Sequence, residues 1–262
     1  MFRYFGYGSN MDITSLRAKG VEPRSSERAV LRGYRLRFNV HHFFRHEGGV
    51  GNVEPSGERA HRVLGVVHEC EDAHLSLLDA AEAYGHGYDR EEVIVETSAG
   101  PISAIAYVGI PSFLDERCLP TRRYLNIMIK GAVNAGLDAS YIEELRRHPL
   151  HASRDYPPFV PPAGVFPRFT AATLADHPRC TSLWGSVFDM SGARWQHDFL
   201  KGFFGGKDMT LFHLKRLDTS DGRESIEDIK RGRLSEVQRR CLTAFLHEYD
   251  HEYEYVGHFD YE

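Results

Sequence analysis

A proline-rich segment near the middle of the chain places the strongest constraint on what this sequence can fold into. Residues 156–167 (YPPFVPPAGVFP) contain five prolines and one glycine. Proline lacks a backbone N–H and fixes φ, so this density excludes a helix and an inner strand. We therefore expect a linker at residues 156–168. It would separate a catalytic domain, residues 1–155, from an accessory α+β domain, residues 169–262.

The composition is typical of a globular protein. Of 262 residues, 42% are hydrophobic and 26% charged, and the net charge is −5. No basic run suggests nucleic-acid binding. The longest apolar runs, residues 63–67 and 102–110, are far shorter than the roughly 20 residues of a membrane span. The N-terminus lacks the layout of a signal peptide, so we predict a cytoplasmic protein that binds neither nucleic acid nor membranes.

Cysteine and histidine give no sign of a disulfide framework or a metal site. The four cysteines are scattered, with no CxxC pair, which favours reduced thiols. The chain has fifteen histidines, and those near residues 41–46 and 247–258 lack acidic or sulfur partners at a metal-ligand spacing. We therefore predict no metal site.

Hydrophobic periodicity predicts a first domain that mixes strands and helices. Alternating residues predict strands at 2–7, 29–39, 62–68, 92–96 and 102–108. Apolar residues at helical spacing predict helices at 12–19, 72–84, 121–135 and 139–147. The glycine-rich residues 46–57 predict a loop or a bulged strand. In the second domain we expect a helix at 234–249 and an acidic, aromatic tail that packs on the surface or frays.

The loop that follows the first predicted strand is a candidate anion site. It reads Tyr7-Gly8-Ser9-Asn10-Met11 and precedes a helix that Asp12 is suited to cap. Glycine lets a backbone approach a ligand closely, and a helix N-terminus offers unpaired N–H donors to an anion. An ordinary strand-to-helix turn explains the same pattern equally well.

Glu82 is a candidate general base. It ends an otherwise apolar helical stretch and shares a helix face with Leu75 and Leu78. Burial there would disfavour the charged carboxylate and raise its pKa toward that of a useful base. The alternative is a partly exposed glutamate at a helix end, which is common in proteins.

Five segments, in order, resemble the γ-glutamylcyclotransferase family over nearly the whole first domain. They are FGYGSNM (5–11), GGVGNVEPSG (48–57), LGVVHEC (64–70), LLDAAEAYGHGYDREEVIV (77–95) and residues 111–145. The resemblance implies an α+β fold, a mixed β-barrel with flanking helices. It also implies that Glu82 is catalytic and that the substrate contacts Tyr7, Gly8, Ser9, Asn10, Met11, Asp12 and Tyr124. The chain departs from the family at Ala83, where members usually have glycine, and this change would tighten the site or alter the substrate.

The resemblance also implies a reaction. The α-amine of a γ-glutamyl group attacks its own γ-carbonyl and releases 5-oxoproline and a free amine, without a metal or an organic cofactor. The partner would be a small γ-glutamyl molecule, such as glutathione, a γ-glutamyl amino acid or a pathway intermediate. A γ-glutamyl amide hydrolase or another γ-glutamyl-processing enzyme on the same fold remains an alternative. As for the oligomeric state, a homodimer stays open.

Three segments of the second domain resemble the haem- and steroid-binding fold of the membrane-associated progesterone-receptor family. They are FTAATLADHP (169–178), LWGSVFDMS (183–191) and FFGGKDMTLFHL (203–214). The tyrosine that would ligate haem before Gly205 is missing, so we expect no haem. His197 is expected on a wet helix face, and His213 inside the core. The domain would cover the mouth of the first domain's site or recruit a partner. A non-enzymatic module with a ligand-binding second domain stays open.

Overall fold

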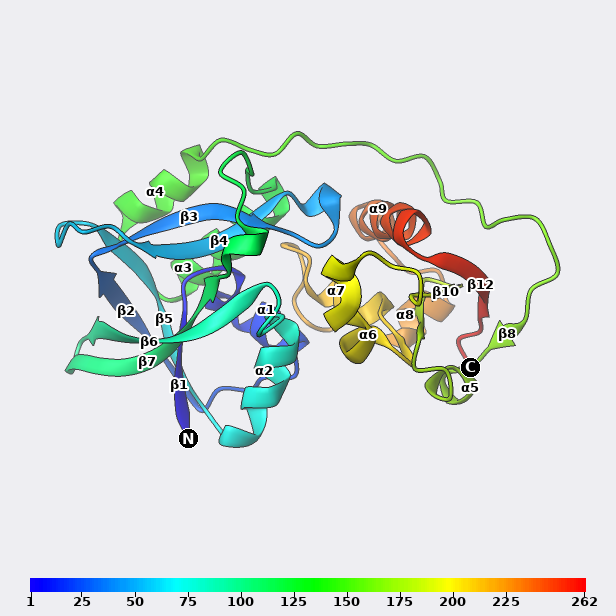
Figure 1. Ribbon diagram of the computed structural model, residues 1–262, viewed down its shortest axis with the longest axis horizontal. Helices are drawn as coiled ribbons and strands as arrows, with labels where there is room; N and C mark the ends of the chain where they lie inside the picture. The colour runs from blue at the N-terminus through cyan, green and yellow to red at the C-terminus, as the bar shows by residue number, and fades with distance from the viewer. The chain divides into compact units, whose positions relative to one another are not determined.

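The computed structural model describes residues 1–262, which divide into two compact units, Met1–Ala152 and Ser153–Glu262 (Figure 1). None of its helices combines the length and the apolar character needed to cross a membrane. The assignment of a catalytic and an accessory role to the two parts stays a prediction.

The first unit is built on a closed barrel of five strands in the order β1-β5-β2-β6-β7. β1 pairs antiparallel with β5 and parallel with β7, so the barrel is mixed, as predicted. Apolar side chains from alternate positions of these strands fill its interior, among them Phe5, Val63 and Val95. The barrel strands are β1 (Phe2–Gly6), β2 (Ser25–Arg32), β5 (Arg62–Cys70), β6 (Tyr88–Thr97) and β7 (Gly100–Gly109).

The prediction of one strand over residues 29–39 is wrong. The chain turns at Gly33, where φ is +78°, and this turn divides the segment into β2 and β3 (Tyr34–His41). β2 continues the barrel, whereas β3 forms a separate ribbon with β4 (Gly49–Pro55). Alternation persists through the turn, so the sequence pattern alone does not reveal the change of sheet. β4 falls within the segment predicted as a loop or bulged strand, and its pairing with β3 is irregular between Arg37 and Val40.

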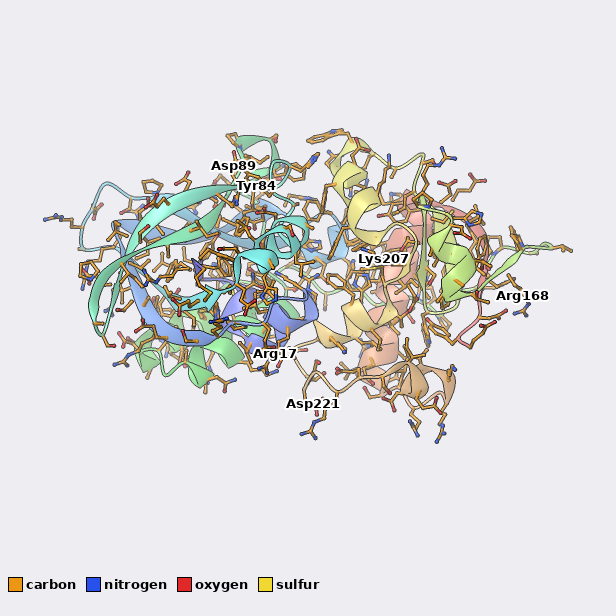
Figure 2. All side chains as sticks on the ribbon, turned by 90° about the horizontal axis from the view of Figure 1, so that it is seen from below. Arg17, Tyr84, Asp89, Arg168, Lys207 and Asp221 are labelled. Atoms are coloured by element: carbon orange, nitrogen blue, oxygen red, sulfur yellow. The ribbon has the colours of Figure 1, made fainter.

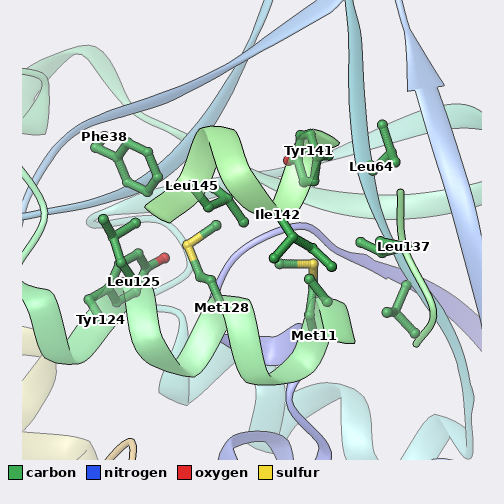
Figure 3. Packing of buried hydrophobic residues seen from close by; sticks show 12 residues of the cluster. Met11, Phe38, Leu64, Tyr124, Leu125, Met128, Leu137, Tyr141, Ile142 and Leu145 are labelled. Carbon is green, nitrogen blue, oxygen red and sulfur yellow. The ribbon is translucent and has the colours of Figure 1, made fainter. Parts of the chain in front are cut away.

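The helices of the first unit lie outside the barrel. They are α1 (Ile13–Ala18), α2 (Leu75–Ala81), α3 (Arg122–Asn134) and α4 (Ala139–Arg147), with short 3₁₀ turns η1 (Ser9–Met11), η2 (Arg45–Glu47), η3 (Asp72–His74) and η4 (Pro111–Phe113). Thr121 caps α3 by accepting a hydrogen bond from the backbone of Tyr124. The buried face of α3 packs on α4 and on Met11 of η1 (Figure 3). This packing fixes η1 beside the barrel.

The second unit contains a five-stranded sheet in the order β11-β9-β10-β12-β8. Its strands are β8 (Arg168–Phe169), β9 (Cys180–Leu183), β10 (Ser186–Asp189), β11 (Lys207–Asp208) and β12 (Glu254–Phe259). Its helices are α5 (Ala171–Ala175), α6 (Asp198–Phe204), α7 (Thr210–Lys215), α8 (Ile226–Lys230) and α9 (Glu236–Glu252), with a 3₁₀ turn η5 (Trp195–His197).

The expectation that the C-terminal tail frays or packs on the surface is wrong. After α9 the chain enters the sheet as β12, which pairs with both β10 and β8. Tyr255, Gly257 and Phe259 occupy alternate positions of β12 and are buried. The acidic residues of the tail obscured this alternation in the sequence.

The proline-rich segment belongs to the second unit and contacts it near both ends. It forms no helix or strand before β8, and Asp155 pairs with Arg240 of α9 at 2.5 Å. His247 of α9 donates to the carbonyl of Pro157 at 2.8 Å, and the ring of Phe166 contacts that of Tyr255. The segment is therefore extended and is held near its two ends, whereas Val160 and Val165 between them are exposed.

Candidate active site

The loop between β1 and α1 presents unpaired backbone donors. β1 ends at Gly6, and η1 is closed by hydrogen bonds from the N–H groups of Met11 and Asp12 to the carbonyls of Gly8 and Ser9. The N–H groups of Gly8, Ser9 and Asn10 donate to no acceptor within the chain. An N–H group with no protein partner is available to an anionic ligand.

Asn10 connects the loop to its surroundings. Its side-chain nitrogen donates to Tyr4 Oη and to Glu82 Oε1, both at 2.8 Å. Its side-chain oxygen accepts from Lys19 Nζ at 2.7 Å. Its carbonyl oxygen accepts from His68 Nε2 at 2.9 Å. Because both ends of the amide and the backbone are held, the orientation of Asn10 is fixed.

Glu82 lies at the C-terminal end of α2, as the sequence pattern predicts. Its backbone N–H donates to Leu78, and its side chain is 15% exposed. The next residue, Ala83, is buried and has a φ of +54°, a left-handed conformation that favours glycine. The reversal at Ala83 ends the helix so that the Glu82 carboxylate reaches Asn10.

Lys19 is a site residue that the sequence analysis missed. Its ammonium lies 2.5 Å from Glu82 Oε1, and its side chain is only 4% exposed. A buried ammonium requires a nearby negative charge, so the pair must be kept together. Nothing in the local sequence distinguishes Lys19 from a solvated lysine at the end of a helix.

Tyrosines enclose a small cavity beside the Glu82 carboxylate. Its volume is about 30 Å³. Burial raises the pKa of Tyr4 and Tyr88 well above the ordinary value, and the charge of Glu82 raises them further. These hydroxyls are therefore neutral at physiological pH. The cavity is lined by Tyr4, Tyr7, Gly8, Ser9, Asn10, Gly51, Glu82, Tyr88, Tyr107 and Tyr124.

Gly51 of β4 holds two of these tyrosines. Its N–H donates to Tyr124 Oη at 2.9 Å, and its carbonyl accepts from Tyr88 Oη at 2.8 Å. On the other side, Tyr7 Oη donates to the carbonyl of Tyr107. Tyr107 Oη in turn donates to Asp79 of α2 at 2.6 Å. The walls of the cavity are thus tied to five separate elements, β4, α3, β6, β7 and α2.

His68 of β5 supports the loop through its hydrogen bond to the carbonyl oxygen of Asn10. It is 1% exposed, and its second ring nitrogen contacts Ser26 Oγ at 2.7 Å. Burial lowers the pKa of His68 to about 4. The ring is therefore neutral at physiological pH and acts as a hydrogen-bonding support for Asn10.

Six of the eight predicted site residues line the cavity, and two do not. Met11 points away into the apolar cluster of α3 and α4 (Figure 3). Asp12 caps α1 by accepting from the backbone of Ser15, and it lies 3.5 Å from Lys130. Tyr4, Tyr88 and Tyr107 were missed because strand alternation marks them only as core residues. Those that line the cavity are Tyr7, Gly8, Ser9, Asn10, Glu82 and Tyr124.

Two histidines of the second unit, His197 and His213, are buried. His213 is hydrogen-bonded to Tyr249 Oη at 2.9 Å and packs on the ring of Phe245. The expectation of a wet helix face for His197 is wrong: it is 1% exposed and hydrogen-bonded to Tyr253 Oη at 2.8 Å. The neighbouring Asp198 and Lys201 indicated a polar face, but the 3₁₀ turn η5 directs His197 inward.

Comparisons with known proteins find a family that resembles most of the first unit. The family model "Gamma-glutamyl cyclotransferase, AIG2-like" matches residues 4–126. No curated protein matches the sequence. The family model ends before the second unit, and the resemblance of that unit to the progesterone-receptor family is not borne out.

Solved structures resemble part of the chain. An uncharacterised protein from Homo sapiens is 26% identical with a TM-score of 0.50, and the match covers 61% of this chain and 93% of that one. YkqA from Bacillus subtilis is 24% identical with a TM-score of 0.50, covering 57% and 56%. A structure titled "Gamma-glutamyl cyclotransferase" is 25% identical with a TM-score of 0.49, covering 61% and 93%.

Proposed function

We propose that this protein cleaves a γ-glutamyl amide to 5-oxoproline and a free amine, in keeping with the match of residues 4–126 to the family model "Gamma-glutamyl cyclotransferase, AIG2-like". One observation carries the proposal. The Glu82 carboxylate lines a cavity whose other walls are mostly tyrosines. Gly8, Ser9 and Asn10, with their backbone donors, line the same cavity.

The reaction needs a base and a site for negative charge. Glu82 takes a proton from the α-ammonium, and the freed amine attacks the γ-carbonyl carbon of the same molecule. The tetrahedral intermediate carries an oxyanion. When the γ-C–N bond to the acceptor breaks, the leaving nitrogen takes the proton back from Glu82. The attacking nitrogen loses its second proton as it becomes the lactam N–H, and the released amine takes that proton to become an ammonium. No water is consumed, and the enzyme ends in its starting protonation state.

The loop donors suit the negative charges of this substrate. The N–H groups of Gly8, Ser9 and Asn10 are available to the α-carboxylate or to the developing oxyanion. A well-placed donor to an oxyanion typically lowers the activation barrier by roughly 3 kcal/mol. The attack is intramolecular, so holding the γ-glutamyl chain in a folded conformation supplies much of the remaining acceleration.

The cavity volume limits how the substrate enters. About 30 Å³ accommodates roughly two water molecules, which is less than a complete γ-glutamyl group. We therefore expect the reacting end of that group to occupy the cavity and the acceptor amine to extend outside it. The acceptor would then be selected by residues beyond the lining.

Product analysis tests the proposal. The protein is incubated with glutathione, γ-glutamyl amino acids and γ-glutamyl amines, and both 5-oxoproline and glutamate are measured. We expect 5-oxoproline from at least one compound. Glutamate in its place would show a hydrolase, and no turnover of any γ-glutamyl compound would refute the proposal.

A variant of the base sharpens the test. Glu82→Gln keeps an oxygen for Lys19 and Asn10 to donate to but removes the base, so we expect turnover to fall by about 100- to 10,000-fold. Glu71→Gln is the matched control, since Glu71 is 51% exposed and pairs with Arg24 on the surface. Wild-type turnover in a folded Glu82→Gln variant would remove Glu82 from the mechanism.

A further inference from the structure

We propose that Lys19 is a positioning residue that keeps Glu82 ionised and directed at the loop, so that the base is ready to accept a proton at neutral pH. This inference rests on the proposed function. It concerns a residue that neither the family resemblance nor the sequence pattern singled out.

The end of α1 fixes the backbone of Lys19. The N–H of Gly20 donates to the carbonyl of Arg17 at 2.9 Å, and the N–H of Val21 donates to that of Leu16 at 3.4 Å. This pair of bonds, with Gly20 at a φ of +79°, is a Schellman motif in which Lys19 is the C-cap. Leu16 and Val21 are fully buried, so the motif is anchored in the core. The Lys19 side chain therefore leaves the helix in a defined direction.

That direction brings Lys19 to two groups of the site. Its ammonium lies 2.5 Å from Glu82 Oε1 and 2.7 Å from Asn10 Oδ1. Asn10 itself donates to the same carboxylate oxygen at 2.8 Å. The three side chains form a closed triangle of hydrogen bonds. A lysine that only neutralised charge would not need to hold the amide as well.

The tyrosines and the histidine around Glu82 are neutral at physiological pH. Burial and the charge of Glu82 raise the pKa values of the tyrosines that face it from β1, the loop, β6 and β7. His68 of β5, behind Asn10, has a pKa lowered to about 4 by burial. Asp79, on the same helix as Glu82, accepts from Tyr107 and lies 3.6 Å from Arg90. The tyrosines are Tyr4, Tyr7, Tyr88 and Tyr107.

The pair has consequences for both proton transfers. With Lys19 present, the resting site holds one positive and one negative charge. When Glu82 accepts the substrate proton, the Lys19 ammonium is left without its counterion in a buried environment. This state is unfavourable, so the proton is readily given to the leaving amine. Lys19 thus weakens Glu82 as a base but promotes return of the proton.

Lys19→Met tests the inference, because methionine has a similar length and no charge. Loss of the cation should raise the pKa of Glu82. The midpoint of the acid limb in the pH profile of kcat/KM for 5-oxoproline release should therefore move to higher pH by about one to three pH units. Lys19→Arg restores the positive charge, so its midpoint should lie close to that of the wild type. Arg17→Met is the matched control. Arg17 lies on the same helix, is 56% exposed and pairs with Glu22, so its loss should leave the limb unchanged (Figure 2).

A direct titration separates this inference from the proposed function. The Glu82 carboxyl ¹³C signal, assigned by its loss in Glu82→Gln, is followed with pH in wild type and Lys19→Met. We expect its midpoint to rise by one to three pH units in the variant. An unchanged midpoint would overturn the role of Lys19, whatever the activity. If the midpoint rises but the wild type releases no 5-oxoproline, the proposed function fails and the charge pairing stands. If Lys19→Met does not fold, Lys19→Gln is titrated in its place.

Discussion

The contact between Gly8 and Tyr124 gives a prediction that can be worked out atom by atom. A β-carbon at residue 8 would lie 2.7 Å from Tyr124 Oη, too close for both atoms to keep their places. The same hydroxyl accepts the hydrogen bond from the Gly51 N–H at 2.9 Å. In Gly8→Ala the hydroxyl must move aside, and the buried N–H of Gly51 then loses its acceptor.

The magnitude follows from that lost hydrogen bond. A buried donor without a partner costs about 1 to 3 kcal/mol. We expect Gly8→Ala and Tyr124→Phe each to lower the free energy of unfolding of the first unit by this amount. In the double variant the nearest ring atom is Tyr124 Cζ, 3.9 Å from the new β-carbon, which is an ordinary contact. The double variant should therefore be no less stable than Tyr124→Phe alone.

Calorimetry measures the effect on the whole chain. Both tryptophans, Trp184 and Trp195, belong to the second unit, so tryptophan fluorescence identifies the melting transition of that unit. The other transition reports the first unit. For a unit of this size, 1 kcal/mol corresponds to about 2 to 4 °C, so each single substitution should lower that Tm by roughly 2 to 12 °C. Costs that add within about 0.5 kcal/mol in the double variant would refute the proposed contact.

Three further predictions concern stability and domain structure. The folded pKa of His68, about 4, lies below its unfolded value, so its contribution to stability is complete above about pH 6.5 and is lost toward pH 4. His68→Asn should therefore flatten the pH dependence of urea unfolding in that window by up to about 1.4 kcal/mol per pH unit, and an unaltered slope would contradict it. Ala83→Val should lower the Tm of the first unit by the equivalent of about 1 to 3 kcal/mol, because a β-branched residue is strained at a φ of +54°. Ala83→Gly should change it by less than about 1 kcal/mol, since relief of strain offsets the lost methyl group and the added chain entropy. Limited proteolysis at residues 155–164 should leave a folded N-terminal fragment, and a fragment that unfolds would show that the two parts depend on each other.

Local sequence patterns identified much of the first unit. Five predicted strands and four predicted helices of that unit coincide with observed elements, apart from the division at Gly33. The loop at Tyr7–Met11 and the position of Glu82 at the end of α2 were also predicted. These features depend on residues close together in the chain, where periodicity, glycine and helix caps act directly. The second unit was less predictable, because its charged and aromatic tail concealed the alternation of β12.

The sequence by itself determined that a glutamate ends an apolar helix and that a glycine loop joins a strand to a helix. Only the tertiary structure decided that Lys19 and Glu82, 63 residues apart, form a buried ion pair, and that Asn10 reaches Glu82 across 72 residues. The tertiary structure also places in the cavity wall tyrosines that strand alternation identifies only as core residues. The physical reason is that periodicity reports which side of an element is apolar. Which groups lie opposite that side depends on long-range strand pairing and helix packing, and the charge state of Glu82 depends on those groups.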